Sequence, residues 1–258
     1  MMKFLLRVSF LLFLPFLIAA DSGLLWLVNF ENTLEASYRP AQLEYLDGYP
    51  IRPEAAAAFR KMHKDMKAGG IEGLRLQSAF RPHSHQQVLF DYKVKAWREL
   101  GHPEEIAETL AAHSVARAGA SEHQTGLAID VSVNGQLSVH FGSTEAGVWL
   151  RNNACDYGFI IRYPQGKTHF TKIMYEPWHL RYVGVPHSQY MREFNLCFEE
   201  YITHVKEAGI LLHWVDEKVY YKVSYFDRVP EGAEASQISS LGLGTPGYIV
   251  TEKKVFLR

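Results

Sequence analysis

Two short segments of the chain carry residues whose types and spacing could bind a metal ion. In the first, SEHQTGLAIDVS at residues 121–132, a histidine and an aspartate stand seven residues apart, at His123 and Asp130. The end of this segment alternates as a strand does, so Asp130 would lie opposite three aliphatic side chains, those of Leu127, Ile129 and Val131. Gly126 allows a tight turn into that strand. His123, just before the turn, would therefore reach the same point as Asp130.

The second segment, YEPWHLRY at residues 175–182, contains His179, about fifty residues after Asp130. Two imidazoles and one carboxylate on rigid elements form a zinc set with an open fourth position, the arrangement of catalytic rather than structural zinc. A lone histidine is more often a core or surface residue, and the chain has 12 histidines. The prediction of Zn2+ at His123, Asp130 and His179 therefore rests on both motifs occurring together in this order.

Glu176 is the candidate general base beside this metal. In an ideal strand, residues three apart face opposite ways, so Glu176 and His179 would diverge. Pro177 keeps Glu176 extended and removes a donor from the ladder, so we expect Glu176 at the mouth of the strand, beside the metal. A carboxylate there could take a proton from a water whose pKa zinc lowers to about 7. The alternative is a glutamate in a surface salt bridge.

Arg81 is the candidate anion-binding residue, because it ends a predicted strand just before a predicted helix. A guanidinium there could point into a cleft and make bidentate contacts with a substrate carboxylate. The alternative is a solvated surface charge. Gln86 and Ser121 could add hydrogen bonds to the same carboxylate or to the peptide, and Trp178 is expected to form a packing wall.

The elements that must position these residues follow from periodicity and from helix and turn signals. Residues 31–52 read as an irregular lead-in. Helices are expected from Pro53 to Gly69, from 85 to 99 behind a capping box at Ser84 and Gln87, after Pro103, from Ser143 or Thr144 to about 154, and from Ser188 to Gly209. Strands are expected at 74–81, 127–132 and 159–163, and further strands at 219–225 and 248–256 form a small β-rich appendage over 210–258.

Composition excludes several classes of protein. The chain has 258 residues, 47% of them hydrophobic, and a formal net charge of −1, which fits an ordinary globular protein. Without a basic excess, we expect no nucleic-acid partner. Cys155 and Cys197 are too few for a disulfide scaffold, and the sequence leaves open whether they pair or stay free.

The first twenty residues have the layout of a secretory signal: Lys3 and Arg7, then an apolar run from Val8 to Ala20. Cleavage near Ala19 or Ala20 would export the protein. The alternative is a retained membrane anchor, a tether through the N-terminus, since residues 24–30 are also apolar. Either reading places the remainder outside the cytoplasm, in the periplasm or at the cell envelope.

These residues resemble the VanY-type zinc D-alanyl-D-alanine carboxypeptidases and their LD-carboxypeptidase relatives. The resemblance covers roughly residues 40–195 and rests on SAFR at 78–81 with Gln86, SEHQTGLAIDVS at 121–132, YGF at 157–159 and EPWHLRYVG at 176–184. At 82–85 this chain has PHSH, where the family more often has Ser-Tyr before the glutamine. The resemblance implies an α+β fold in which a small antiparallel sheet, packed with helices, carries the zinc site within residues 31–209.

The family pattern further implies zinc at His123, Asp130 and His179, Glu176 as the catalytic base, and Arg81 with Ser121 as receptor of the substrate's terminal carboxylate. The implied reaction removes the C-terminal D-alanine from peptidoglycan stem peptides. Zinc ligands alone leave open LD-carboxypeptidase or endopeptidase action on the same polymer. A different class is a non-catalytic zinc domain that binds wall fragments or a protein, although such a domain needs no base at Glu176.

Overall fold

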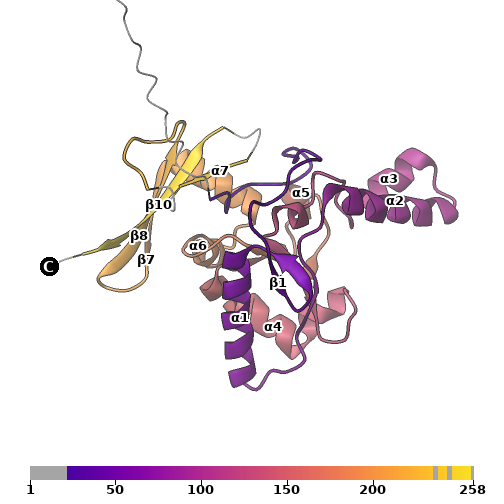
Figure 1. Ribbon diagram of the computed structural model, residues 1–258, viewed down its shortest axis with the longest axis horizontal. Helices are drawn as coiled ribbons and strands as arrows, with labels where there is room; N and C mark the ends of the chain where they lie inside the picture. The colour runs from indigo at the N-terminus through magenta and orange to yellow at the C-terminus, as the bar shows by residue number, and fades with distance from the viewer. Residues whose placement is uncertain (1–21, 235–237, 243–245, 257–258) are drawn as a thin grey trace, which may run out of the picture.

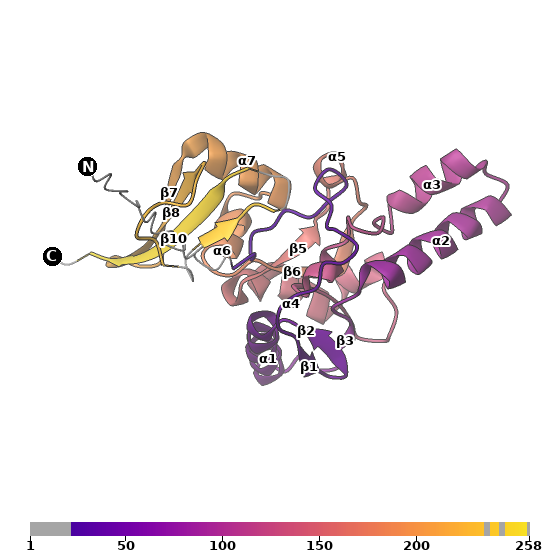
Figure 2. The same ribbon diagram turned by 45° about the horizontal axis from the view of Figure 1, so that its top comes forward.

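The computed structural model describes residues 22–234, 238–242 and 246–256, and the predicted export segment, residues 1–20, lies outside them. Helices and small antiparallel sheets alternate through these ranges, which confirms the predicted α+β fold (Figure 1). Two of the sheets have four strands each: β7-β8-β10-β9 lies at one end of the molecule, and β3-β4-β6-β5 lies near its middle (Figure 2). The sheet near the middle carries the predicted metal ligands.

This catalytic sheet has the strand order β3-β4-β6-β5, with every neighbouring pair antiparallel. Its strands are β3 (Arg75–Ser78), β4 (Ala128–Ser132), β6 (Glu176–Tyr182) and β5 (Phe159–Tyr163). One face is apolar and packs on helices α1 (Pro53–Ala68) and α4 (Glu145–Asn153). The shared core includes Phe59, Met62 and Met66 of α1, Leu150 of α4, and Leu76, Ile129, Val131 and Leu180 of the sheet. The opposite face is left for polar side chains.

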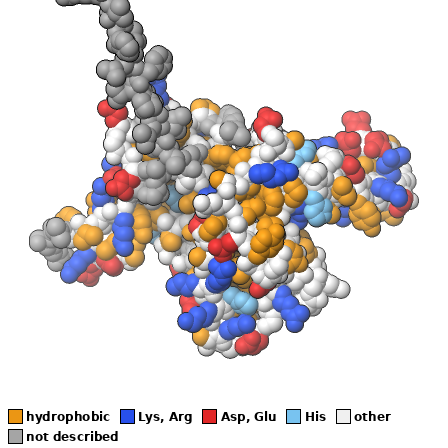
Figure 3. Space-filling model, in the orientation of Figure 1, with side chains coloured by type: hydrophobic (Ala, Val, Ile, Leu, Met, Phe, Trp, Pro, Cys, Tyr) orange, Lys and Arg blue, Asp and Glu red, His pale blue; other side chains and the backbone are white. Residues whose placement is uncertain are grey.

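Two helices beyond β3 form an arm that extends from the body (Figure 2). They are α2 (His83–Glu99) and α3 (Glu104–Ala112), and they pack through Phe90, Val94, Ala107 and Ala111. The arm carries charges of both signs on the face seen in Figure 3. The predicted capping box is wrong: α2 begins directly after Pro82 with no side-chain cap, and Ser84 lies inside its first turn. Pro82 occupies the N-cap position in an extended conformation, with a φ of −68°.

The expected irregular lead-in contains a short hairpin, β1 (Glu44–Leu46) and β2 (Tyr49–Ile51). Asp47 and Gly48 form its turn, with φ angles of 50° and 86°. Asp-Gly is a preferred pair for a two-residue turn with both φ angles positive. The sequence prediction missed this signal because the flanking strands have only three residues each.

The predicted helix from Ser188 to Gly209 is two helices, α6 (His187–Glu193) and α7 (Phe198–Ala208). The chain breaks at Asn195, which has a φ of 50°, a left-handed conformation that asparagine tolerates. Cys197 then caps α7, and the Glu200 carboxylate accepts a hydrogen bond from the Cys197 backbone N–H. Cys155 and Cys197 are both free thiols, so the two do not pair.

The second four-stranded sheet follows α7, in the order β7-β8-β10-β9. Its strands are β7 (Ile210–Trp214), β8 (Val219–Phe226), β9 (Ile238–Ser240) and β10 (Tyr248–Val255). Its inner face shares one core with α6, α7 and the segment at 24–28, through residues such as Leu25, Met191, Tyr201, Leu211 and Ile249. None of the helices in the described ranges combines the length and apolar character needed to cross a bilayer.

Candidate metal centre

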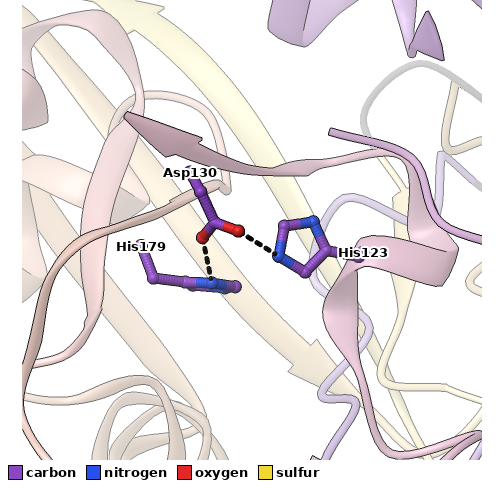
Figure 4. Close-up of side chains that lie close together, drawn as sticks. All are labelled: His123, Asp130 and His179. Carbon is purple, nitrogen blue, oxygen red and sulfur yellow. Dashed lines mark hydrogen bonds and ion pairs between the residues drawn. The ribbon is translucent and has the colours of Figure 1, made fainter. Parts of the chain in front are cut away.

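Three side chains converge on the polar face of the catalytic sheet: His123, Asp130 and His179 (Figure 4). One ligand atom from each lies within 4.8 Å of the other two, and all three residues are buried. The Asp130 carboxylate lies between the two rings, with Oδ2 3.1 Å from His123 Nε2 and Oδ1 3.0 Å from His179 Nδ1. We refer to these three residues as the metal centre.

The local sequence explains this convergence. Asp130 on β4 and His179 on β6 are direct cross-strand partners, so their side chains project from the same face. His123 comes from η1 (Glu122–Thr125), a short 3-10 helix that ends at Gly126 before the chain enters β4. The predicted turn into the strand is therefore a single helical turn closed by a left-handed glycine with a φ of 70°.

The donor set fits zinc. His123 Nδ1 lies 2.7 Å from the carbonyl oxygen of Ala79, so this nitrogen carries the proton and donates it. Burial lowers the pKa of His123, which favours the neutral ring. Its Nε2 lone pair then faces a carboxylate oxygen of Asp130. Two acceptors in contact repel unless a cation binds both, as zinc does with imidazole and carboxylate ligands.

Gly126→Ala tests how strictly the turn after His123 depends on glycine. A Cβ at this position would lie 3.0 Å from Leu43 Cδ2 and 3.1 Å from Arg52 Cγ, in a left-handed backbone. We expect a loss of about 2–4 kcal/mol in the free energy of unfolding, from backbone strain and crowding together. Gly135→Ala is the matched control, because Gly135 has a φ of 82° with open space around it. Urea unfolding of both variants measures the difference, and equal losses would contradict the crowding at Gly126.

Glu176 lies at the first residue of β6, and its Oε2 is 3.9 Å from His179 Nδ1. The β5–β6 ladder is irregular between Ile161 and Tyr163, so the alternation that would turn Glu176 away from His179 does not hold there. The sequence analysis attributed this position to Pro177, which was expected to keep Glu176 outside the regular strand. In the structure β6 begins at Glu176 and includes Pro177. Burial and the charge of Asp130 raise the pKa of Glu176 well above its usual value, against the opposing charge of Arg81. A carboxylate in this state is suited to exchange protons.

Arg81 enters the site because β3 ends early. The predicted strand 74–81 alternates only to Leu76, where a bulge shifts the register and buries Ala79. The Arg81 backbone N–H donates to the His123 carbonyl oxygen at 3.1 Å. Its guanidinium donates to Ser78 Oγ at 2.9 Å and lies 3.6 Å from Asp130 Oδ2. Arg81 is therefore held beside the metal centre.

Gln86 lies in the same cleft as Arg81 and contacts its guanidinium. Its Oε1 accepts from Arg81 at 2.7 Å, and its Nε2 donates to the carbonyl oxygen of Ala116 at 2.6 Å. Gln86 therefore helps to orient the Arg81 guanidinium. Ser121 is buried and lines the same cleft.

All eight residues singled out from the sequence line one cleft of about 660 Å³. Leu89 and Tyr92 of α2, Leu137, Val139 and Met174 add apolar walls to it, and Trp178 packs partly against the main core. Tyr163 also lines the cleft, with its ring centroid 5.0 Å from that of His179. The sequence prediction missed Tyr163, because nothing in its local segment shows that β5 lies beside β6.

Comparison with known proteins gives consistent matches over this region. A family profile described as VanY, D-alanyl-D-alanine carboxypeptidase, matches residues 49–185. The chain is 41% identical over 198 residues to the putative carboxypeptidase YodJ of Bacillus subtilis (strain 168), covering 72% of this chain and 69% of that one. Among solved structures, the LdcB LD-carboxypeptidase superposes with a TM-score of 0.62 at 40% identity, covering 70% of this chain and 86% of that one.

A second solved structure bears on the metal. It is a glutamate-to-alanine variant of the vancomycin-resistance D,D-pentapeptidase VanY, in complex with Zn(II). Its TM-score is 0.62 at 35% identity, and the match covers 70% of this chain and 98% of that one.

Proposed function

Because the chain belongs to the VanY family of D-alanyl-D-alanine carboxypeptidases, we propose that it is a zinc-dependent carboxypeptidase that removes the C-terminal D-alanine from peptidoglycan stem peptides. This proposal rests on the residues that line one cleft. A three-residue metal centre, the glutamate Glu176 and the guanidinium of Arg81 all line it. A metal-dependent carboxypeptidase needs these three parts: a metal, a base and a group that binds a terminal carboxylate.

The bound metal supplies Lewis-acid chemistry, which lowers the pKa of water and polarises a carbonyl. The residues of the chain supply the rest. Glu176 takes a proton from the attacking water and delivers it to the nitrogen of the departing D-alanine. Its raised pKa supports the second of these steps, because it favours the protonated form of the carboxyl. Tyr163 packs against the ring of His179 and helps to hold its orientation.

Arg81 would bind the terminal carboxylate of the substrate. Gln86 and Ser78 hold the guanidinium through its terminal nitrogens, and its distance of 3.6 Å from Asp130 places it beside the reaction centre. Ser121 could add a hydrogen bond to the same carboxylate, and Trp178 forms a wall of the cleft. A fixed cation this close to the metal selects substrates that end one residue beyond the scissile bond.

Incubation with defined muropeptides tests the reaction. Purified, zinc-loaded protein is expected to release D-alanine from a pentapeptide that ends in D-Ala-D-Ala. Similarity to LdcB favours a second candidate, LD-carboxypeptidase action, which would release D-alanine from the tetrapeptide. Cleavage between stem residues without release of D-alanine would indicate an endopeptidase, and no cleavage of any of these substrates would indicate a non-catalytic zinc domain.

Arg81→Gln tests the carboxylate-binding role. We expect kcat/KM for the pentapeptide to fall about 10- to 100-fold, the effect of one charged hydrogen-bonding group. A pentapeptide amide lacks the carboxylate, so its slow cleavage by the wild type should be nearly unchanged in the variant. Arg75→Gln, at an exposed position on β3, is the control and should behave as wild type. Equal losses on both substrates would mean that Arg81 acts through Asp130 instead, and zinc analysis would then detect metal loss.

We also propose that the protein acts outside the cytoplasm, at the cell envelope or in the periplasm. The charged and apolar pattern of residues 1–20 supports export, with cleavage or with a retained tether. The peptidase domain would span residues 31–209, and the β-rich unit 210–258. N-terminal sequencing of the protein recovered from a cell fractionation would separate cleavage from retention, and recovery of activity only in the cytosolic fraction would contradict export.

A further inference from the structure

We infer that Glu199, on α7, is a positioning residue for the metal centre, and that it acts through a buried ion network behind the metal ligands. The inference rests on the proposed function only for its kinetic readout. The network consists of Glu122, Arg162, Arg181 and Glu199, and we call it the buried ion network. It contributes no group to the cleft, and none of its four residues is among the candidate site residues predicted from the sequence.

The network holds two guanidiniums and two carboxylates in direct contact. Arg162 makes a bidentate pair with Glu199, with NH1 2.9 Å from Oε2 and NH2 2.6 Å from Oε1. Its third nitrogen, Nε, donates to Glu122 Oε1 at 2.8 Å. Arg181 NH1 lies 3.1 Å from the same Glu122 oxygen. The side chains of Glu122, Arg162 and Arg181 have no exposed surface, and that of Glu199 is 13% exposed.

The network adjoins the metal ligands. Glu122 is the residue before His123 on η1. Arg181 lies two residues after His179 on β6, so both side chains project from the same face of the sheet. The register agrees, because Asp130 pairs with His179 and the next residue on that face of β4, Ala128, pairs with Arg181. The polar face of the sheet therefore carries the metal ligands Asp130 and His179, and Arg181 of the buried ion network lies next to them along the same face.

Directional contacts explain how the network could set the ligand positions. A bidentate pair with Glu199 fixes the plane of the Arg162 guanidinium, and its Nε then fixes the Glu122 carboxylate. Buried charged groups have no water to replace an ion-pair partner, so each group stays in contact with its partner. Movement of Glu122 would move η1, which carries His123. Arg162 also precedes Tyr163, whose ring packs on that of His179.

The residues that complete the network come from outside the region matched by the family profile, 49–185. Phe198 of α7 lies under both guanidiniums, 5.6 Å from that of Arg162 and 5.5 Å from that of Arg181. Asn29 donates to Glu199 Oε1 at 3.3 Å, and Arg181 NH2 donates to the carbonyl oxygens of Leu24 and Trp26. The segment at 24–29 and α7 thus anchor the catalytic sheet from behind, which gives the C-terminal part of this chain a role in the site.

Glu199→Gln and Glu200→Gln form a matched pair that tests the inference in the full-length protein. The two glutamates are neighbours on α7 and each pairs with a cation, but Glu200 pairs with Lys167, outside the network. We expect Glu199→Gln to raise the dissociation constant for zinc and to lower kcat, each roughly tenfold, with KM nearly unchanged. The absorption spectrum of the Co2+-substituted protein should also change, because it reports ligand geometry. Glu200→Gln should lower the melting temperature alone.

If Glu199→Gln does not fold, the comparison of Glu199→Asp with Glu200→Asp tests the inference. Aspartate keeps the negative charge and changes only its position. The inference is overturned if the Glu199 variants lose thermal stability while zinc affinity, cobalt spectrum and kcat match those of the Glu200 variants. Zinc affinity and the cobalt spectrum do not depend on the substrate. An inactive wild type would therefore refute the proposed function and leave the positioning role to be judged by those two measurements.

Discussion

Replacing Glu176 by glutamine is expected to lower kcat for D-alanine release by about 10²- to 10⁴-fold while zinc stays bound. Glutamine keeps the size of the side chain but cannot accept and return a proton at the position 3.9 Å from His179 Nδ1. The three metal ligands are untouched by the change, so metal content should stay near that of the wild type. Release of D-alanine and atomic absorption on the same sample measure both quantities.

Glu145→Gln provides the control for the general effect of removing one carboxylate. Glu145 is exposed in the first turn of α4, away from the residues that line the cleft, and this variant should turn over as the wild type does. Two results would contradict the role of Glu176. Unaltered turnover would exclude it as the proton carrier, and loss of zinc would mean that it acts as a ligand.

Replacing His123 by alanine is expected to remove zinc and activity together. His123 supplies the Nε2 lone pair opposite Asp130, and without it only Asp130 and His179 remain of the metal centre. Atomic absorption should then find little zinc after dialysis, and D-alanine release should fall below detection. A second readout is thermal stability. A metal that binds only the folded state raises the free energy of unfolding by about 4 kcal/mol when the free metal concentration is a thousand times the dissociation constant. Added zinc should therefore raise the melting temperature of the wild type and not that of the variant.

His140→Ala is the matched control, since His140 is exposed on η2 (Val139–Ser143) and lies outside the metal centre. It should keep its zinc and its zinc-dependent stabilisation. A full zinc complement in His123→Ala would remove that histidine from the ligand set and with it the assignment of the site.

Local spacing in the sequence determined the core of the site. Alternation over Leu127 to Ser132 placed Asp130 on the polar face of a strand, and the structure pairs Asp130 directly with His179 on that face. Helix signals at Pro53 and Thr144 also correspond to helix starts, and Thr144 Oγ1 accepts from the Gly147 N–H as a cap does. These features depend on backbone geometry over a few residues, which the order of residue types specifies.

Where several local signals competed, the outcome depended on packing. The capping-box spacing at Ser84 and Gln87 was outweighed by Pro82, and the predicted helix from Ser188 divides at Asn195. The division lets the first turn of α7 turn inward, with Phe198 against the two arginines. The helical periodicity of the hydrophobic residues continues across Asn195, so it does not reveal the break.

Tertiary structure alone decided which charges are buried and what they touch. Arg162 reads as one polar residue in a short strand, yet it contacts Glu122 and Glu199, which are 40 and 37 residues away along the chain. The sequence likewise does not show that the Gln86 amide donates to the carbonyl oxygen of Ala116, 30 residues on. A sequence specifies periodicity because neighbouring residues share one backbone geometry. The partner of a buried polar group depends instead on which distant segments the folded core brings together.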